Sequence, residues 1–110
     1  MKLPNAARAF VDIAKLRDYC LDSTHPEGRH KARVFHSALG ISSGDAEFLH
    51  EAILDAVAGG DAVAGDLDTY GARYLVDFEL KRETMRAAIR TVWIVRRNED
   101  FPRLLTCYVL

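Results

Sequence analysis

The sequence has little cysteine and no long apolar run. Its two cysteines, Cys20 and Cys107, are far apart and neither belongs to a CxxC motif, which argues against a zinc ribbon or a redox motif. We expect two buried free thiols, because free cysteine packs as a small hydrophobic residue. No stretch approaches the roughly 20 apolar residues that cross a bilayer, and the first residues lack the apolar run of a signal peptide. The sequence therefore predicts a cytoplasmic location and no membrane contact.

Motifs of common hydrolases and nucleotide-binding proteins are also missing. No serine or cysteine lies in a recognisable nucleophile elbow, and the one short glycine-containing turn, at 70–74, precedes a predicted strand and cannot cradle phosphate. His30 and His36 are six positions apart, which rotates them to different sides of a helix and prevents them from chelating one metal. The sequence thus predicts neither a metal site nor a cofactor.

The composition is that of an ordinary soluble domain. The chain has 110 residues, of which 49% are hydrophobic and 28% charged, and it contains no internal repeat, linker or low-complexity segment. Domains of this size form one core. We therefore expect a single domain over residues 1–110.

Charge is unevenly distributed although the net charge is only −1. Residues 29–40 contain lysine and arginine but no acid, whereas residues 41–67 contain six acids and no lysine or arginine. From residue 68 onward eight basic residues outnumber six acids. If the fold separates the acidic segment from the others, a basic surface exists on a near-neutral protein.

Helical spacing dominates the first half of the chain. Apolar residues at 13, 16 and 20 follow Asp12, a good N-cap residue. Pro26 and Gly28 predict a loop before the next helix, and Gly40 predicts its end. The expected elements are a brief strand at 9–11 and helices over 12–21, 29–38 and from 42 or 43 to 59.

Alternation typical of strands begins near residue 70. Apolar and polar residues alternate over 73–80, and a second strand over 85–97 has a centre that is apolar on both faces, as expected for a strand inside a sheet. A last strand covers 104–110, with Pro102 near its start. The predicted fold is α+β, with two to three N-terminal helices packed on one face of a three- to four-stranded antiparallel sheet.

The helix over 29–38 contains the first candidate site residues. Phe35 lies at the centre of its apolar face, and Lys31 falls on the same face. That lysine either snorkels past the helix end or occupies a partly dry site where its charge has a role. His30 and Arg33 project away from the core, and His36 lies at the boundary of the apolar face.

The strands contain further candidates. Arg90 is close to an apolar strand centre, so it either pairs with Asp77 or Glu79 on a neighbouring strand or meets an anion. Donors along the last strand are Arg103, Thr106 and Tyr108, although threonine and tyrosine are also common in strands for packing reasons alone.

An acidic ridge is predicted on the third helix. Glu47, Glu51 and Asp55 recur every four residues and stack on one face. The ridge is either a solvated helix face or a contact surface for a basic partner.

Seven motifs occur in order along nearly the whole chain. They are DIAKLRDY at 12–19, HP at 25–26, GRHKARVF at 28–35, LG at 39–40, YGARYLVDF at 70–78, RTVWIV at 90–95 and PRLLTCY at 102–108. Together they resemble an uncharacterised family of small bacterial domains, whose members occur as single-domain proteins and at the carboxyl ends of polymorphic toxins. N-terminal helices followed by an antiparallel sheet are also similar, at the level of fold, to the barnase, EndoU, colicin and RelE group of metal-independent ribonucleases.

The ribonuclease resemblance implies RNA cleavage by attack of a 2′-hydroxyl on the adjacent phosphate. This reaction needs a proton acceptor, a proton donor and cations that stabilise charge on phosphorus. Proton transfer then falls to His30 or His36, although the helix itself contains no glutamate that could pair with a histidine as a base. Phosphate contacts fall to Lys31 and Arg90. Positioning donors would be Thr106 and Tyr108, and further substrate contacts Arg33, Arg73, Tyr74 and Arg103.

A non-catalytic interaction protein is the alternative: an antitoxin, an immunity factor or a partner-binding module. The acidic ridge supports it, as does an apolar final strand whose edge can pair with another chain. The expected partners are thus RNA, a small cognate antitoxin or immunity protein, or a second copy of the chain joined through an edge strand.

Overall fold

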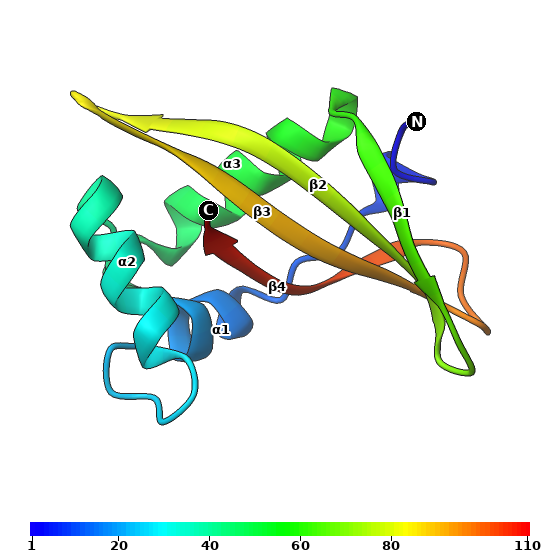
Figure 1. Cartoon of the computed structure of the whole chain (residues 1–110), viewed down its shortest axis with the longest axis horizontal. Helices are drawn as coiled ribbons and strands as arrows, with labels where there is room; N and C mark the ends of the chain where they lie inside the picture. Colours follow the sequence, from blue (N-terminus) through cyan, green and yellow to red (C-terminus); the bar gives the residue numbers. More distant parts are fainter.

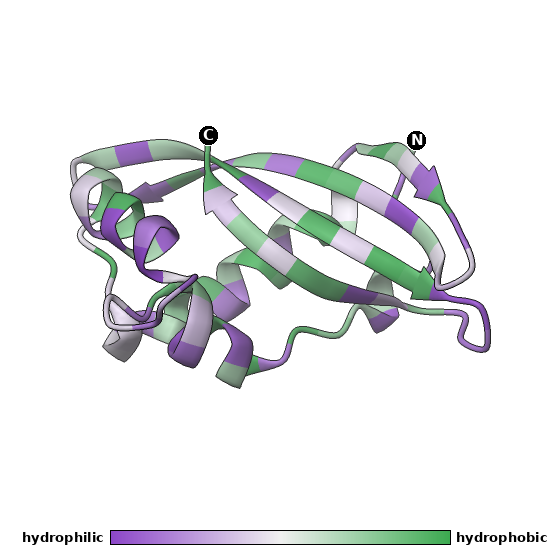
Figure 2. Ribbon diagram, turned by 60° about the horizontal axis from the view of Figure 1, so that its bottom comes forward, coloured by the Kyte–Doolittle hydropathy of each residue, from purple (hydrophilic) through white to green (hydrophobic).

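The computed structural model describes all residues, 1–110, and contains a four-stranded antiparallel sheet with its helices on one side (Figures 1 and 2). This arrangement confirms the predicted α+β class. The helical elements are η1 (Ala6–Arg8), α1 (Ile13–Lys15), η2 (Leu16–Cys20), α2 (Arg29–Leu39), η3 (Ser43–Asp45) and α3 (Ala46–Gly59), and the strands are β1 (Ala62–Leu67), β2 (Gly71–Arg82), β3 (Met85–Arg96) and β4 (Pro102–Val109). None of the helices has the length and apolarity needed to cross a bilayer.

The strands follow one another across the sheet in the order β1-β2-β3-β4. The pairing of β2 with β3 is the longest, from Gly71 opposite Arg96 to Arg82 opposite Met85. Since β3 lies between β2 and β4, its apolar centre is inside the sheet, as predicted. The turn between β2 and β3 is shorter than the predicted 81–84, because β2 continues through Arg82, whereas β3 begins at Met85 as predicted. In this turn Glu83 has a positive φ of 56°.

The first strand, β1, was not predicted. Of its six residues only Ala62 is buried, so its sequence shows no alternation that would indicate a strand. The segment is a strand because its backbone pairs with β2, with Val63 opposite Leu75. The last strand also begins earlier than expected, at Pro102.

The core lies between the helices and the inner face of the sheet. Val76, Ile89 and Trp93 contribute from the strands, and Phe35 and Leu49 from α2 and α3, all without solvent exposure. Burying each such side chain stabilises the fold by roughly 1.5–3 kcal/mol. The predicted apolar face of α2, centred on Phe35, is therefore confirmed.

The helix predicted over 12–21 is a short α-helix that widens into a π-helical turn. The Asp12 carboxylate caps it by accepting the Ala14 N–H at 3.0 Å. The wide turn closes with the Leu21 N–H donating to the Leu16 carbonyl at 2.8 Å, five residues back. Leu16 and Cys20 are both fully buried in this turn, which brings Cys20 against β4.

Glycine 28 lets α2 begin directly on this turn. A Cβ at Gly28 would lie 2.0 Å from the Tyr19 carbonyl oxygen, so no other residue fits without moving the helix. Gly40 ends α2 with a left-handed φ of 66°, as predicted. The helix lies at one end of the sheet, beside β4 (Figure 1).

The outer edge of β4 is partly occupied by the chain itself. Phe10 donates to the Pro102 carbonyl at 2.9 Å and accepts the Leu104 N–H at 3.0 Å, so the strand expected at 9–11 is a single bridge. The other edge of the sheet is β1, where Val63 and Leu67 are 64% and 75% exposed.

Candidate functional site

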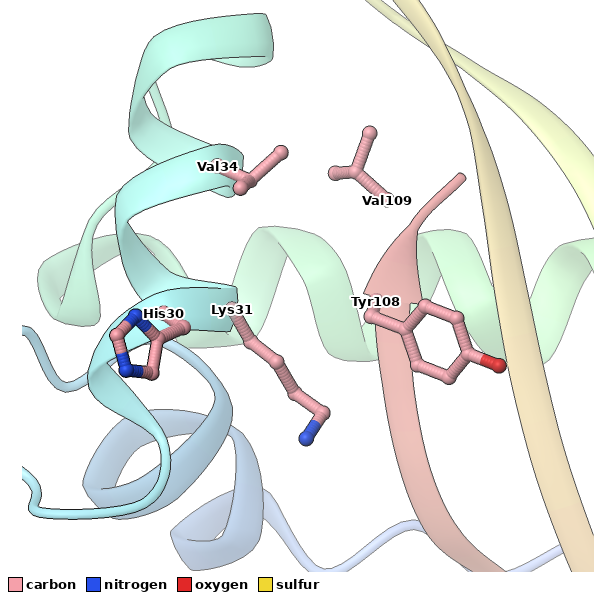
Figure 3. Close-up of a pocket in the computed structure, with 5 residues that line it drawn as sticks. All are labelled: His30, Lys31, Val34, Tyr108 and Val109. Carbon is pink, nitrogen blue, oxygen red and sulfur yellow. The ribbon is translucent and has the colours of Figure 1, made fainter.

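A hollow of about 390 Å³ lies between α2 and β4. His30, Lys31 and Val34 line it from the helix, and Tyr108 and Val109 line it from the strand (Figure 3). We call it the α2–β4 hollow. It brings together three of the six catalytic candidates, His30, Lys31 and Tyr108. In the sequence, Tyr108 is 77 or more positions from the two helix residues.

Lys31 is half-buried in the wall of this hollow. Its Nζ donates to the Tyr19 hydroxyl at 3.4 Å and lies 5.3 Å from the centre of the Tyr19 ring. The Tyr19 ring in turn packs edge-to-face on His25, with ring centres 4.9 Å apart. Nδ1 of His25 accepts the N–H groups of Glu27 and Gly28, each at 3.0 Å. The lysine therefore occupies a partly dry site, where an aromatic pair anchored in the 22–28 loop supports it.

Tyr19 and His25 were not among the residues predicted for the site. Helical periodicity places Tyr19 at the end of a helix and says nothing about a contact across the loop. The signal in the sequence was the spacing of His25, Pro26 and Gly28, because a histidine just before a tight turn can accept the backbone donors of that turn.

Most lysines and arginines that have no acidic partner lie on the N-terminal helices α1 and α2. Nine of the fifteen lysines and arginines make an ion pair. The six that make none are Lys15, Arg29, Lys31, Arg33, Lys81 and Arg97. Four of these six precede residue 34, so the acid-free segment seen in the sequence remains unneutralised in the fold.

A second hollow, of about 410 Å³, lies on another side of α2. We call it the serine hollow. It contains His36, so the two histidines of α2 face different hollows, as their spacing predicted. Its lining residues are Leu21, Ser23, Ala32, Arg33, His36, Ser42 and Ser43.

Arg90 is held by an acid on the neighbouring strand. Its Nε and Nη2 donate to the two carboxylate oxygens of Asp77, both at 2.9 Å. This bidentate pair raises the pKa of Arg90, with a smaller contribution from Tyr108, and lowers the pKa of Asp77. Tyr108 lies opposite Arg90 in the β3–β4 register, and its hydroxyl is directed toward β3, whereas Lys31 reaches in from α2 (Figure 3). Two roles were predicted for Arg90, a cross-strand ion pair and a contact with an anion, and the structure shows the ion pair.

Thr106 lies beside the two cysteines. Its Oγ1 is 3.9 Å from the Sγ of Cys20, and both Cys20 and Cys107 are buried free thiols, as predicted. Hydrogen bonding to Cys107 lowers the pKa of Cys20, aided by Thr106 and Lys31, and the same pairing with burial raises the pKa of Cys107.

A family comparison matches residues 2–110 to a domain of unknown function, DUF6883. The chain belongs to this family. Comparisons with curated proteins and with solved structures gave no match. Membership of DUF6883 confirms the resemblance to an uncharacterised domain family and assigns no activity.

Three other candidate residues of this DUF6883 domain lie away from both hollows. Arg73 pairs with Asp68, and Tyr74 packs against the core. Arg103 makes a bidentate pair with Glu99 at 2.8 and 2.7 Å. The structure therefore gathers His30, Lys31 and Tyr108 at one hollow and Arg33 with His36 at another. The candidates that line neither hollow are Arg73, Tyr74, Arg90, Arg103 and Thr106.

Proposed function

We propose that this DUF6883 domain is a toxin-like, metal-independent endoribonuclease that acts in the α2–β4 hollow. One observation carries the proposal: Lys31 is half-buried at the hollow, next to His30, and has no carboxylate partner. A cation kept partly dry and uncompensated is suited to stabilising an anion, since electrostatic interactions strengthen away from water.

In the proposed reaction the 2′-oxygen of a ribose attacks the adjacent phosphorus. His30 accepts the 2′-hydroxyl proton as the bond from O2′ to phosphorus forms. Lys31 stabilises the charge on the five-coordinate phosphorus, and Tyr108, on the opposite wall of the hollow, is the positioning donor. The bond from phosphorus to O5′ then breaks, and the proton held by His30 returns through solvent to that oxygen. The products are a 2′,3′-cyclic phosphate and a 5′-hydroxyl.

The test is incubation of the purified chain with RNA in the presence of a chelator. Lys31→Ala should lower the cleavage rate about 10²- to 10³-fold, the usual effect of removing one transition-state donor, and His30→Gln about 10²-fold or more. Lys81→Ala is the control, because Lys81 likewise makes no ion pair but is exposed and lies at the hairpin end of β2, away from the hollow. Absence of cleavage by the intact chain, or equal loss in the Lys81 variant, would refute the proposal.

A non-catalytic partner-binding role is the second candidate. Glu47, Glu51 and Asp55 are exposed on α3 and make no ion pair, so the acidic ridge is free for a basic partner. Growth arrest on induction in a bacterium, relieved by Lys31→Ala, supports the nuclease. No arrest and no cleavage, together with a folded chain, support the binding role.

A further inference from the structure

The serine hollow has the composition of an oxyanion site. Three hydroxyl groups, one guanidinium and one imidazole line it, and no carboxylate does. Arg33 and His36 are three positions apart on α2, so they lie next to each other on one face of the helix. Neither makes an ion pair within 4.0 Å.

The acids near this hollow are already engaged. Asp45 accepts the Arg82 Nη2 at 2.9 Å through one oxygen and the Ser42 N–H at 2.9 Å through the other. The Asp22 carboxylate accepts both the backbone N–H and the hydroxyl of Thr24, at 2.9 and 2.6 Å. Hence Arg82 neutralises the charge of Asp45, and Thr24 orients the charged Asp22 carboxylate, which forms no ion pair with Arg33.

Two parts of the wall, the Ser42 turn and the backbone of α2, are held in place by the fold. Ser42 is fixed by a reciprocal capping box with Asp45 at the start of η3. Ala32, beside Arg33, is buried in the core side of α2, and η2 and η3 pack against each other. A preorganised site loses less entropy on binding than one that must order its side chains.

We infer that the serine hollow binds a phosphate group. The planar guanidinium of Arg33 can donate two hydrogen bonds to one phosphate, and His36 and the hydroxyls of Ser23 and Ser43 supply donors in other directions. The Ser42 hydroxyl already donates to Asp45 at 3.4 Å. The volume of about 410 Å³ falls in the range of about 300–1,000 Å³ for small-ligand sites, so a sugar attached to the phosphate also fits.

A more specific inference rests on the proposed function. If RNA is cleaved in the α2–β4 hollow, the serine hollow holds a second phosphate of the same strand. An α-helix with its side chains is about 10 Å wide, so a strand that crosses α2 reaches both hollows. The phosphate ligand is then either part of the RNA or a small nucleotide, and the two sources are separated by experiment.

The experiment is a titration of the isotope-labelled chain with inorganic phosphate, uridine monophosphate and a short oligoribonucleotide, followed by amide NMR. Saturable shifts are expected at Ser23, Ser42 and Ser43. Arg33→Gln should weaken phosphate binding about tenfold or more. Arg29→Gln is the control, because Arg29 is also exposed and unpaired on α2 but does not line the hollow. Shifts that never saturate, or equal weakening by the two variants, would overturn the inference.

The oligoribonucleotide arm identifies the source of the phosphate. If Arg33→Gln weakens RNA binding as well, the hollow holds a phosphate of the strand. If it weakens only the mononucleotide and inorganic phosphate, the ligand is a small phosphate compound. Saturable phosphate binding by a chain that cleaves no RNA keeps this inference and removes the nuclease, so the two failures are distinguishable.

Discussion

At the scale of single residues, one hydroxyl group organises the centre of the core. Thr91 is fully buried between β2 and β4. Its Oγ1 donates to the Val76 carbonyl at 2.7 Å and accepts the indole N–H of Trp93 at 2.7 Å. The largest buried side chain of the protein therefore depends on this hydroxyl for its only polar contact.

Thr91→Val should destabilise the protein although it preserves the shape of the side chain. The change leaves the buried indole N–H of Trp93 without an acceptor, which costs about 1–3 kcal/mol. Urea denaturation measures the free energy of unfolding. Thr84→Val, in the exposed β2–β3 turn, should change it by less than about 0.5 kcal/mol; a similar small change for Thr91→Val would show that the hydroxyl is dispensable.

Single-residue predictions from the sequence succeeded where periodicity fixes a face. The helical period correctly placed Lys31 beside Phe35, and strand alternation correctly offered Asp77 as a partner for Arg90. Tyr19 and His25 were not predicted, because their placement next to the lysine depends on the conformation of the 22–28 loop. Hydrophobic periodicity gives no information about a loop conformation. The site was thus half predictable: its cation was found, and the aromatic pair that supports the cation was not.

At the scale of elements, Asp45 joins the start of α3 to the far end of β2. It caps η3 and binds Arg82, whose guanidinium also lies 5.0 Å from the ring centre of Phe48. The Arg82 hydrogen bond, followed by the Ser42 backbone N–H, lowers the pKa of Asp45 to about 2. One carboxylate therefore links the η3 turn, which directly precedes α3, to the end of β2.

The stability that Asp45 contributes should depend on pH. A lowered pKa in the folded state means that this contribution is present above about pH 4, the unfolded value, and is lost as the pH falls toward 2. Asp45→Asn should therefore lower the melting temperature at pH 6. The difference in melting temperature between this variant and the unsubstituted protein, the gap, should disappear between pH 4 and 2. The control is Asp66→Asn, exposed and unpaired on β1. A gap that persists unchanged at pH 2 would contradict this role.

Close packing of α2 on η2 gives a second prediction at this scale. Gly28→Ala places a Cβ on the Tyr19 carbonyl and must push α2 outward, which disturbs the contact between Tyr19 and Lys31. We expect lower stability, by about 1–3 kcal/mol as for other overpacked sites, and slower RNA cleavage. Gly44→Ala is the control, since a Cβ there meets nothing within 4 Å. Unchanged stability and cleavage in the Gly28 variant would show that α2 tolerates the shift.

The elements themselves were predicted where burial leaves a pattern. Residues 29–39 and 85–96 carry strong apolar periods and appeared nearly as expected. Residues 62–67 form β1 with five of six side chains exposed, so no hydrophobic pattern could indicate it. The π-helical turn at 16–20 was also invisible, because it keeps residues 16 and 20 on the buried side just as an α-helix would.

At the scale of the whole molecule, charge is separated although the sum is close to zero. Most arginines of the sheet are neutralised by acids on a neighbouring strand or in the turns between strands. The unpaired cations that remain lie mainly on α1 and α2, and the unpaired acids of the ridge lie on α3. The fold therefore presents an anionic partner with one attractive region instead of a uniform surface.

RNA binding should follow this separation when salt is varied. Each phosphate contact adds about 0.7 to the slope of log affinity against log salt for a single strand. Lys31→Ala and Arg33→Gln should each lower the slope by about that amount. Arg17→Gln is the matched control on the same helical front, because Asp18 already neutralises Arg17 at 3.0 Å. Fluorescence anisotropy with a labelled oligoribonucleotide measures the slopes. If the Arg17 variant lowers the slope as much as the Lys31 variant, RNA affinity depends on the total charge of the protein. The unpaired cations of α2 would then not be a specific RNA contact.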